Sequence, residues 1–341
     1  MEGLQILAAD TEAGAKVLLN AGRPLYVNDR TGVVVLRNAR GLQVNSLLLE
    51  KEWVELDNVI MTAARYPLRA VNDLKSRGLT HPLGGLETLV SQYTKSGEVT
   101  GAAVSMSGQG GSQRDLPENI PVGVPIPIIF KEFSIDTRTL LASRRMGDGI
   151  DVTAAMEGSR VVAEGAENLL INGWSGRLNG ALLYGYRNHP DRNTDTAANY
   201  GGGAWSTITN IVPTVAGMVT AANADNHYGP FVLYASQASY NLAALQYYAD
   251  ASGDTPLVRI RKMPMIADVL PLPVNSLPAG ELLLVEMAMT TVDWAEAQDI
   301  QMVEWTSGDG MQSNFKLMMA AAPRVKSRFD GKSGIIHATS A

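Results

Sequence analysis

The stretch from Phe133 to Trp174, which decides the fold, reads FSIDTRTLLASRRMGDGIDVTAAMEGSRVVAEGAENLLINGW. Its second half predicts one long helix from Val152 to Asn172, with Asp151 as N-cap and Gly173 at its end. Apolar and small side chains recur along this helix at helical spacing, so one stripe is able to pack against the rest of the chain. At about 1.5 Å of rise per residue, the helix spans roughly 30 Å.

Two glycines interrupt the long helix. Gly158 and Gly165 each cost about 1 kcal/mol of helix stability relative to alanine. Glycine at such positions makes sense where another part of the chain comes close to the helix backbone, and a layer of strands is the expected neighbour. A shorter helix is predicted just upstream, beginning at Asp136 and ending at Gly147.

A third helix is predicted before the decisive stretch, from Ser46 to Arg65. Ser46 is a suitable N-cap, and the apolar side chains that follow it recur at helical spacing. Pro67 ends this pattern, because proline has no backbone N–H to donate. A short helix from Leu68 to Lys75 then follows and ends near Gly78.

Residues 1–46 have too few apolar side chains for a core of their own. Leu4 to Leu19 has the pattern of a weak helix, and Arg23 to Arg40 reads as extended, with a turn at Asp29–Gly32 and a strand at Val33–Leu36. We interpret this segment as an arm that packs against something other than itself.

The stretch from Thr80 to Phe133 is predicted to be a long β-hairpin. Its tip, Ser107–Ser112, is made of glycine, serine and glutamine. The return arm alternates, with apolar side chains pointing one way and prolines between them, and proline in a strand favours an edge or a bulge. The apolar residues are Val122, Val124, Ile126, Ile128 and Phe130, and the prolines are Pro121, Pro125 and Pro127.

The predicted hairpin is too long to lie on its own domain. Arms of about 20 residues at about 3.3 Å per residue reach on the order of 65 Å. Isolated hairpins are marginally stable in water, so we expect this one to rest on a neighbouring copy of the chain. The same pattern is also compatible with an ordinary three-stranded sheet inside one domain.

Downstream of the long helix the pattern becomes α/β. A polar loop is predicted from Arg177 to Gly203. Helices are then expected at Ser206–Ala222 and Ser236–Ala249, on either side of a strand at Phe231–Ala235. Further strands are expected at Met265–Leu270, Leu282–Met287, Ile300–Trp305, Phe315–Ala321 and Val325–Phe329.

Composition narrows the class of protein. The chain has 341 residues, enough for one large or two moderate domains, and 45% of them are hydrophobic while 18% are charged. Soluble domains average about 25% charged residues, so much of this surface is expected to be covered by other subunits. The sequence has no signal peptide and no long apolar run, which predicts no membrane association.

The sequence lacks the residues that common active sites need. There is no cysteine, which excludes disulfides and thiolate chemistry. The net charge of −6 includes no dense basic tract of the kind that sequence-specific nucleic-acid binding uses. The acids Asp148, Asp151 and Glu157 lie where they favour the dipole of the long helix, which is a structural role.

No catalytic motif is present either. The nucleophile elbow GxSxG, the zinc motif HExxH and the phosphate-binding GxxxxGK are all absent, and the glycines at Gly108–Gly111 are explained by a hairpin tip. The histidines have no partner at metal-ligand spacing and are expected to be loop or surface residues: His81, His189, His227 and His337. We therefore predict a protein that is not an enzyme and has no catalytic residues, no cofactor and no metal.

The order of elements from Trp53 to Trp174 resembles the tailed-bacteriophage major capsid family, whose Hong Kong 97-like fold encapsulin nanocompartments share. The resemblance is sharpest over the quoted stretch, where the matching residues are Phe133, Asp136, Arg144, Ala154, Ala155, Ala163, Glu164, Glu167, Asn168, Ile171 and Gly173. The resemblance implies an α+β fold with an N-terminal arm, a long hairpin called the E-loop, a P-domain with a spine helix, and an α/β A-domain.

The resemblance also implies how the chain is divided. The N-terminal arm would be residues 1–46, and a helical segment would follow at 47–79. The E-loop hairpin would span 80–133 and the P-domain with its spine helix 134–180. Residues 181–310 would be mainly the A-domain, and 311–341 would return to the P-domain.

The function implied by the resemblance is structural. Copies would form hexamers and pentamers in an icosahedral virion shell that encloses the double-stranded DNA of a phage, assembled in the host cytoplasm. A separate scaffolding protein, a portal and possibly a decoration protein would be partners, and contact with the packaged DNA would be non-specific. Charged residues that are candidates for contacts between subunits are Lys95, Glu98, Arg114, Asp115, Lys131, Glu132, Arg144 and Arg145.

Two alternatives stay open on the sequence. An encapsulin-type shell around a cargo enzyme has the same fold, although the chain is longer than most encapsulins, with extra length at the N-terminus and around Arg187–Gly203. A soluble α/β enzyme acting through carboxylates is the alternative from another class, and it would need a pocket with converging acids.

Some capsid relatives crosslink a lysine of the E-loop to an asparagine of a neighbour. Here Lys95 is the only lysine in the loop before Lys131, and no matching asparagine is evident.

Overall fold

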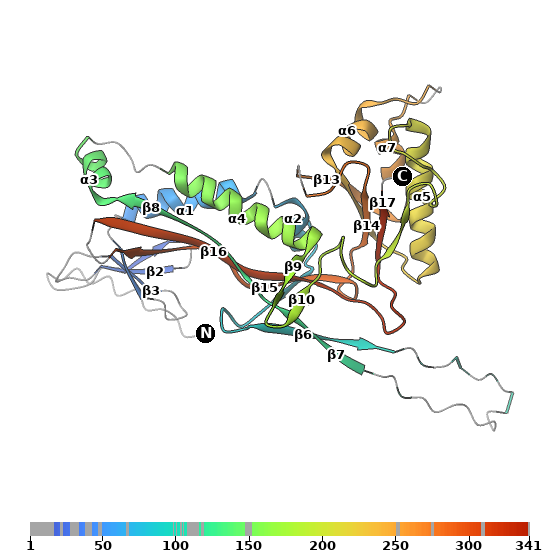
Figure 1. The fold of residues 1–341 in the computed structure, drawn as a ribbon, viewed down its shortest axis with the longest axis horizontal. Coiled ribbons are helices and arrows are strands. Elements are labelled where there is room, and N and C mark those ends of the chain that lie inside the picture. Colours follow the sequence, from blue (N-terminus) through green and yellow to red (C-terminus); the bar gives the residue numbers. More distant parts are fainter. Residues whose placement is uncertain are drawn as a thin grey trace. The chain divides into compact units, whose positions relative to one another are not determined.

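The chain forms a mixed α+β structure in a computed structural model (Figure 1). The residues that the structure describes are 17–20, 23–27, 34–37, 43–46, 50–65, 68–97, 99, 101–102, 104, 106–107, 116, 119–146, 152–249, 253–273, 276–307 and 311–339. Within this part of the chain, no helix combines the length and apolar character needed to span a membrane.

The chain divides into two compact units. The first unit comprises Met1–Leu68, Ile128–Gly165 and Gln298–Ala320, and the second comprises Arg69–Pro127, Ala166–Ala297 and Ala321–Ala341. The segment boundaries predicted from the resemblance to capsid proteins follow a different division and stay a prediction.

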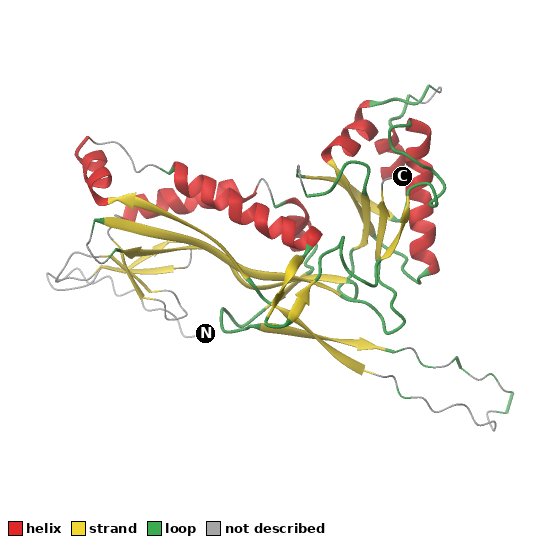
Figure 2. Cartoon of the chain, in the orientation of Figure 1, coloured by secondary structure: helices red, strands yellow, loops and turns green. Residues whose placement is uncertain are grey.

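The first unit contains helices beside a sheet of long strands (Figure 2). Strand β8 pairs with β16 in antiparallel register, from Ile128↔Ala320 to Asp136↔Gln312. The strand order of this sheet is β5-β15-β16-β8. The helices of this unit are α1 (Glu50–Arg65), α3 (Thr137–Met146) and the first part of α4 (Thr153–Asn172), and its strands are β8 (Ile128–Asp136) and the larger parts of β15 (Val292–Thr306) and β16 (Gln312–Val325). Strand β5 (Thr80–Pro82) belongs to the second unit, where it pairs with Trp294–Glu296 of β15.

Helix α4 begins and ends almost where the sequence predicts a helix, from Val152 to Asn172. Its two glycines lie over strand side chains. A Cβ added at Gly158 would be 2.9 Å from Leu317 of β16, and one added at Gly165 would be 3.1 Å from Ile129 of β8. The expected layer of strands therefore lies beside the helix. The atoms that come closest to the two glycines are side-chain atoms of the strands and not backbone atoms. On another side of α4, Ser159 Oγ donates to the carbonyl oxygen of Ile60 in α1 at 2.8 Å.

The N-terminal strands form a four-stranded antiparallel sheet with the order β1-β2-β3-β4. The predicted helix at Leu4–Leu19 is wrong at its end, because Val17–Asn20 pairs with Arg23–Tyr26, and the rest of that helix lies outside the described residues. The strands are β1 (Val17–Asn20), β2 (Arg23–Val27), β3 (Val34–Arg37) and β4 (Gln43–Ser46).

The second unit is built on a five-stranded sheet with the order β11-β17-β14-β12-β13. Strand β12 pairs in parallel with β13 and antiparallel with β14. The strands are β11 (Asn193–Thr196), β12 (Phe231–Ser236), β13 (Ile266–Leu272), β14 (Leu282–Glu286) and β17 (Ile335–Thr339). The helices are α2 (Arg69–Ser76), α5 (Ile208–Ala224), α6 (Gln237–Leu245) and α7 (Pro256–Arg261).

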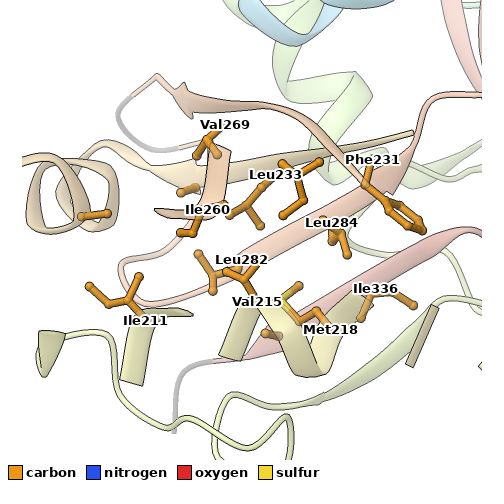
Figure 3. Packing of buried hydrophobic residues seen from close by; sticks show 14 of the residues in the cluster. Ile211, Val215, Met218, Phe231, Leu233, Ile260, Val269, Leu282, Leu284 and Ile336 are labelled. Atoms are coloured by element: carbon orange, nitrogen blue, oxygen red, sulfur yellow. The ribbon is translucent and has the colours of Figure 1, made fainter. Parts of the chain in front are cut away.

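Apolar side chains from α5 and the sheet meet in the core of this unit (Figure 3). Val215 and Met218 of α5 pack with Leu233 of β12 and Leu284 of β14, and all four side chains are fully buried. Close packing of α5 extends to the preceding loop, since a Cβ on Gly217 would lie 1.8 Å from the carbonyl oxygen of Tyr200. Such a position tolerates only glycine without a shift of the backbone.

Several predicted elements of this region need correction. The predicted polar loop at Arg177–Gly203 contains strands. The sequence does not reveal them, because short polar strands such as β11 are stabilised by pairing with a neighbouring strand and show no apolar alternation. The helix predicted to reach Ala249 ends at Leu245. The strand predicted at Val325–Phe329 is wrong, because β16 ends at Val325 and the residues after it are loop and turn. The missed elements are β9 (Trp174–Leu178), β10 (Ala181–Leu183), β11, α7 and β17.

The hairpin predicted between Thr80 and Phe133 has a different extent. Strands β6 (Val90–Ser96) and β7 (Asn119–Pro125) pair antiparallel, from Val90↔Pro125 to Ser96↔Asn119. The predicted return arm breaks at Ile126–Pro127 into β7 and β8, which belong to different sheets. Prolines at the break explain it, because they remove ladder hydrogen bonds. The apolar alternation breaks there too: Ile126 is 9% exposed and Phe130 is 56% exposed.

Candidate functional site

The base of the hairpin is held by its own chain through one face of β6. The alternate residues Ser91, Tyr93 and Lys95 point to the same side, as every second residue of a strand does. Each side chain makes a polar contact with a residue far along the sequence, at Arg324, Val325 or Asp191. We call this set of contacts the hairpin anchor. It differs from the expectation that only a neighbouring copy stabilises the whole segment.

The first contact of the anchor leads to a buried ion pair. Arg324 donates from Nε and Nη2 to the two carboxylate oxygens of Asp293, each at 2.6 Å, and from Nη1 to Ser91 Oγ at 2.9 Å. Lys326 Nζ lies 2.7 Å from the same carboxylate. The Arg324 and Asp293 side chains are 5% and 0% exposed, so water screens this pair little.

The second contact fixes the position of the aromatic ring in β6. Tyr93 donates its hydroxyl proton to the carbonyl oxygen of Val325 at 3.1 Å. Burial, with a smaller contribution from the charge of Asp191, raises the pKa of Tyr93 to about 12. The phenol therefore keeps its proton and remains a donor at neutral pH.

The third contact is a more open ion pair. Lys95 Nζ donates to Asp191 Oδ2 at 2.8 Å, and Ser327 Oγ donates to the same oxygen at 2.5 Å. Partial burial acts to raise the pKa of Asp191, but the hydrogen bonds from Lys95 and Ser327 outweigh it and hold that pKa below its usual range. Both side chains of the Lys95–Asp191 pair are 23% exposed.

A groove of about 250 Å³ lies beside the anchor. It runs between β7 and the β9–β10 hairpin, and mostly apolar or aromatic side chains line it, including Val122, Leu182 and Tyr184. The groove offers no constellation of acids. Among the residues that the structure describes, no three or more His, Asp or Glu side chains lie close enough to hold a metal ion.

Beyond the anchor, the hairpin exposes apolar side chains. Leu89, just before β6, is 62% exposed, and the connection between β6 and β7 carries Val104 at 99%, Met106 at 107% and Leu116 at 93%. Exposed apolar residues that are scattered singly are ordinary on protein surfaces, whereas Val104, Met106 and Leu116 all lie in one connection between two strands.

The residues predicted to make contacts between subunits lie in different parts of the chain. Lys95 has a partner within its own chain, and Glu132 of β8 pairs with Lys316 of β16 at 2.8 Å. Lys131 and Arg145 are exposed. Arg144 lies in α3, but its side chain lies outside the described set, as do Glu98, Arg114 and Asp115 altogether. None of these eight residues is shown to meet another subunit.

Sequence analysis missed the residues that hold the hairpin. Arg324 follows the stretch Ala320–Pro323, which carries no motif, and Asp293 lies within an apolar strand. An arginine and an aspartate inside otherwise buried strands are a signal of ion pairing, because charges are seldom buried without a partner.

The histidines match the expectation of loop or surface positions only in part, since His189 and His227 lie in loops but are not at the surface. His189, His227 and His337 are buried, with 3%, 7% and 3% of their surface exposed, and His337 lies in strand β17 rather than in a loop. Each is hydrogen-bonded within the chain. His227 Nδ1 lies 2.5 Å from Glu286, for example.

Comparison with known proteins identifies the family. A family profile described as "Family of unknown function (DUF6260)" matches residues 42–338. The chain belongs to this family. No curated protein matches it.

The fold itself is shared with several solved structures. A virus-like particle from Pyrococcus furiosus aligns with a TM-score of 0.61 and 13% identity, over 85% of this chain and 100% of that one. The capsid of an empty GTA particle aligns at 0.56 and 12% identity, covering 79% and 90%. The capsid of Myoviridae Phage XM1 aligns at 0.54 and 13% identity, covering 77% and 89%. The fold is therefore the Hong Kong 97-like capsid fold, as the sequence predicts.

Proposed function

We propose that copies of this chain assemble into the closed icosahedral shell of a tailed phage, which encloses its double-stranded DNA. The observation that carries this proposal is the fold shared with proteins whose structures are a capsid or a virus-like particle. The role is structural and requires no catalysis. In this proposal the shell is built of hexamers and pentamers, forms in the host cytoplasm, and uses a scaffolding protein and a portal, with a decoration protein as a further candidate partner.

The hairpin supplies the physical argument for assembly. Its base is anchored within its own chain, whereas Val104, Met106 and Leu116 are almost fully exposed. Burial of a large apolar side chain contributes about 1.5–3 kcal/mol, so these residues favour a partner surface. We assign residues 90–125, which include the paired strands β6 and β7, as an E-loop on this basis, with its far part resting on a neighbouring copy. A subunit held at many edges dissociates slowly, because each further contact forms at high effective concentration.

An encapsulin-type shell that encloses a cargo enzyme is the second candidate. A specific observation favours it: the virus-like particle from Pyrococcus furiosus is covered over its whole length and has the highest TM-score of the three structures compared above. Both candidates require a closed shell and differ in its size and content.

Electron microscopy of the purified protein tests the proposal. Large closed particles favour the phage capsid, and small uniform cages favour the encapsulin-type compartment. A chain that remains monomeric by size-exclusion chromatography at high concentration, also when it is co-expressed with its neighbouring genes, contradicts both.

A variant of the hairpin tests the assembly surface more sharply. Met106→Asp places a charge where we expect an apolar contact, and it should reduce the fraction of assembled protein at least tenfold on a sedimentation gradient. Because Met106 contacts little in its own chain, the circular dichroism of the subunit should not change. The matched control Met106→Leu keeps an apolar side chain and should assemble normally. Normal assembly of Met106→Asp would rule out this residue as a contact.

A further inference from the structure

The buried His337 lies at the centre of a chain of hydrogen-bonded side chains that contains a glutamate and two arginines. Its Nε2 atom is 3.1 Å from Glu281 Oε2, and its Nδ1 atom is 3.3 Å from Arg192 Nε. Glu281 in turn accepts from Arg187 Nε at 2.7 Å and Nη2 at 3.0 Å. The His337 side chain is 4% exposed, so these partners rather than water determine its hydrogen bonds.

The partners fix both the tautomer and the charge of this imidazole. An arginine only donates, so the hydrogen bond from Arg192 requires His337 Nδ1 to be an acceptor without a proton. The single ring proton is then on Nε2 and is donated to Glu281. A second proton on Nδ1 would point at the N–H of Arg192 and would place a third positive charge between Arg192 and Arg187.

We propose that the hydrogen bond between His337 and Arg192 is a pH-sensitive contact. Protonation of His337 in mild acid breaks this contact, and its loss loosens both strand β11 and the hairpin anchor. The charged groups around the imidazole agree with this direction. Burial lowers the pKa of His337, Glu281 opposes that shift, and the cations Arg192 and Arg187 add to it. The His337 imidazole therefore resists protonation in the closed form, in which the contact with Arg192 is made, and is protonated readily in the open form, in which that contact is broken.

Arg192 connects His337 to the base of the hairpin, because its neighbour in the chain is Asp191 of the anchor. Arg192 also donates from Nη1 to the carbonyl oxygen of His189 at 2.8 Å, and the next residue, Asn193, begins β11. Among the strands that the structure describes, β11 lies at the edge of its sheet and pairs with β17, in the register Asn193↔Ile336 to Thr196↔Thr339. Asp191, adjacent to Arg192, holds Lys95 of β6. Displacement of Arg192 therefore acts on β11 and on the anchor together.

The expected size of the effect follows from linkage. An open form with an ordinary histidine pKa of about 6.5 is roughly 97% protonated at pH 5, whereas the closed form disfavours the proton. Opening should therefore become more frequent by on the order of tenfold between pH 7.5 and pH 5, and by more if the closed form excludes the proton completely.

Hydrogen–deuterium exchange of the purified protein tests this inference, with rates corrected for the intrinsic effect of pH. We expect protection in residues 193–196 and 335–339 to fall about tenfold between pH 7.5 and pH 5, while peptides from the core around Leu233 and Leu284 keep theirs. Equal protection at the two pH values, or an equal loss throughout the chain, overturns the proposal.

Two variants separate His337 from its neighbours. The amide of His337→Gln both accepts from Arg192 and donates to Glu281 but does not titrate, so its exchange should be independent of pH over this range. His189 also contacts Arg192, through its backbone carbonyl oxygen, and burial lowers the pKa of its imidazole to about 4. His189→Asn keeps an acceptor for the N–H of Asp191 and should respond to acid like the unmodified protein. A full acid response in His337→Gln, or its loss in His189→Asn, contradicts the assignment to His337.

Discussion

Two buried carboxylates of the second unit have different partners. Asp293 faces the cationic side chains of Arg324 and Lys326. Glu167 of α4 instead accepts hydrogen bonds from the backbone N–H groups of Ala70 at 2.7 Å and Val71 at 3.2 Å, in the first turn of α2. Both side chains are inaccessible to water. The base of the hairpin is therefore held beside a carboxylate that faces full countercharges, whereas α2 and α4 are joined by a carboxylate that backbone N–H groups stabilise, with a smaller contribution from the charge of Arg69.

The hairpin anchor should give the largest effect. Arg324→Ala leaves Asp293 buried with Lys326 as its remaining cation, and loss of one partner of a buried pair costs about 3–5 kcal/mol. Urea unfolding of the purified chain measures this change in the free energy of unfolding.

A double variant sharpens the comparison. Arg324→Met combined with Asp293→Leu removes both charges and should recover most of the lost stability, since apolar residues of similar volume often replace buried pairs at little cost. A single variant Arg324→Ala that loses less than about 1 kcal/mol would mean that the pair does not hold the hairpin.

The helix junction should respond to pH instead. Burial raises the pKa of Glu167 to about 7, and the amides of Ala70, Val71 and Arg69 lower it only in part. Because the folded pKa lies above the unfolded one, this group stabilises the protein most below about pH 4.5 and loses that contribution as pH rises through 7. Between pH 5 and pH 8 the free energy of unfolding should fall by about 2–3 kcal/mol.

The control for this prediction lies one turn away on the same helix. Glu167→Gln cannot ionise, so urea unfolding should lose this pH dependence and the variant should be more stable than the unmodified protein at pH 8. Glu164, whose side chain is 45% exposed and pairs with Arg160, should leave the pH dependence unchanged when it is replaced by glutamine. Parallel pH profiles for Glu167→Gln and the unmodified chain would refute the assignment.

The sequence predicts elements that depend on neighbouring residues better than contacts between residues that are far apart in the chain. The spine helix was predicted almost to the residue, because its apolar stripe and the glycine that ends it are local signals, and Gly173 has the expected positive φ of 65°. The division of the hairpin was missed although Pro125 and Pro127 mark it. The anchor was not predicted, because Ser91 and Arg324 are 233 residues apart and only the folded chain brings them together.

The Lys95–Asp191 pair should give the smallest effect and completes the comparison. Its side chains are each 23% exposed, so water and salt screen the attraction that Arg324 and Asp293 keep in full. Lys95→Met keeps most of the aliphatic stem and should cost about 0.5 kcal/mol. A double-mutant cycle with Asp191→Asn isolates the pair, and its coupling energy should decrease at high salt. A coupling as large as that of Arg324 with Asp293 would contradict the view that burial of the countercharge decides the strength of each contact in the anchor.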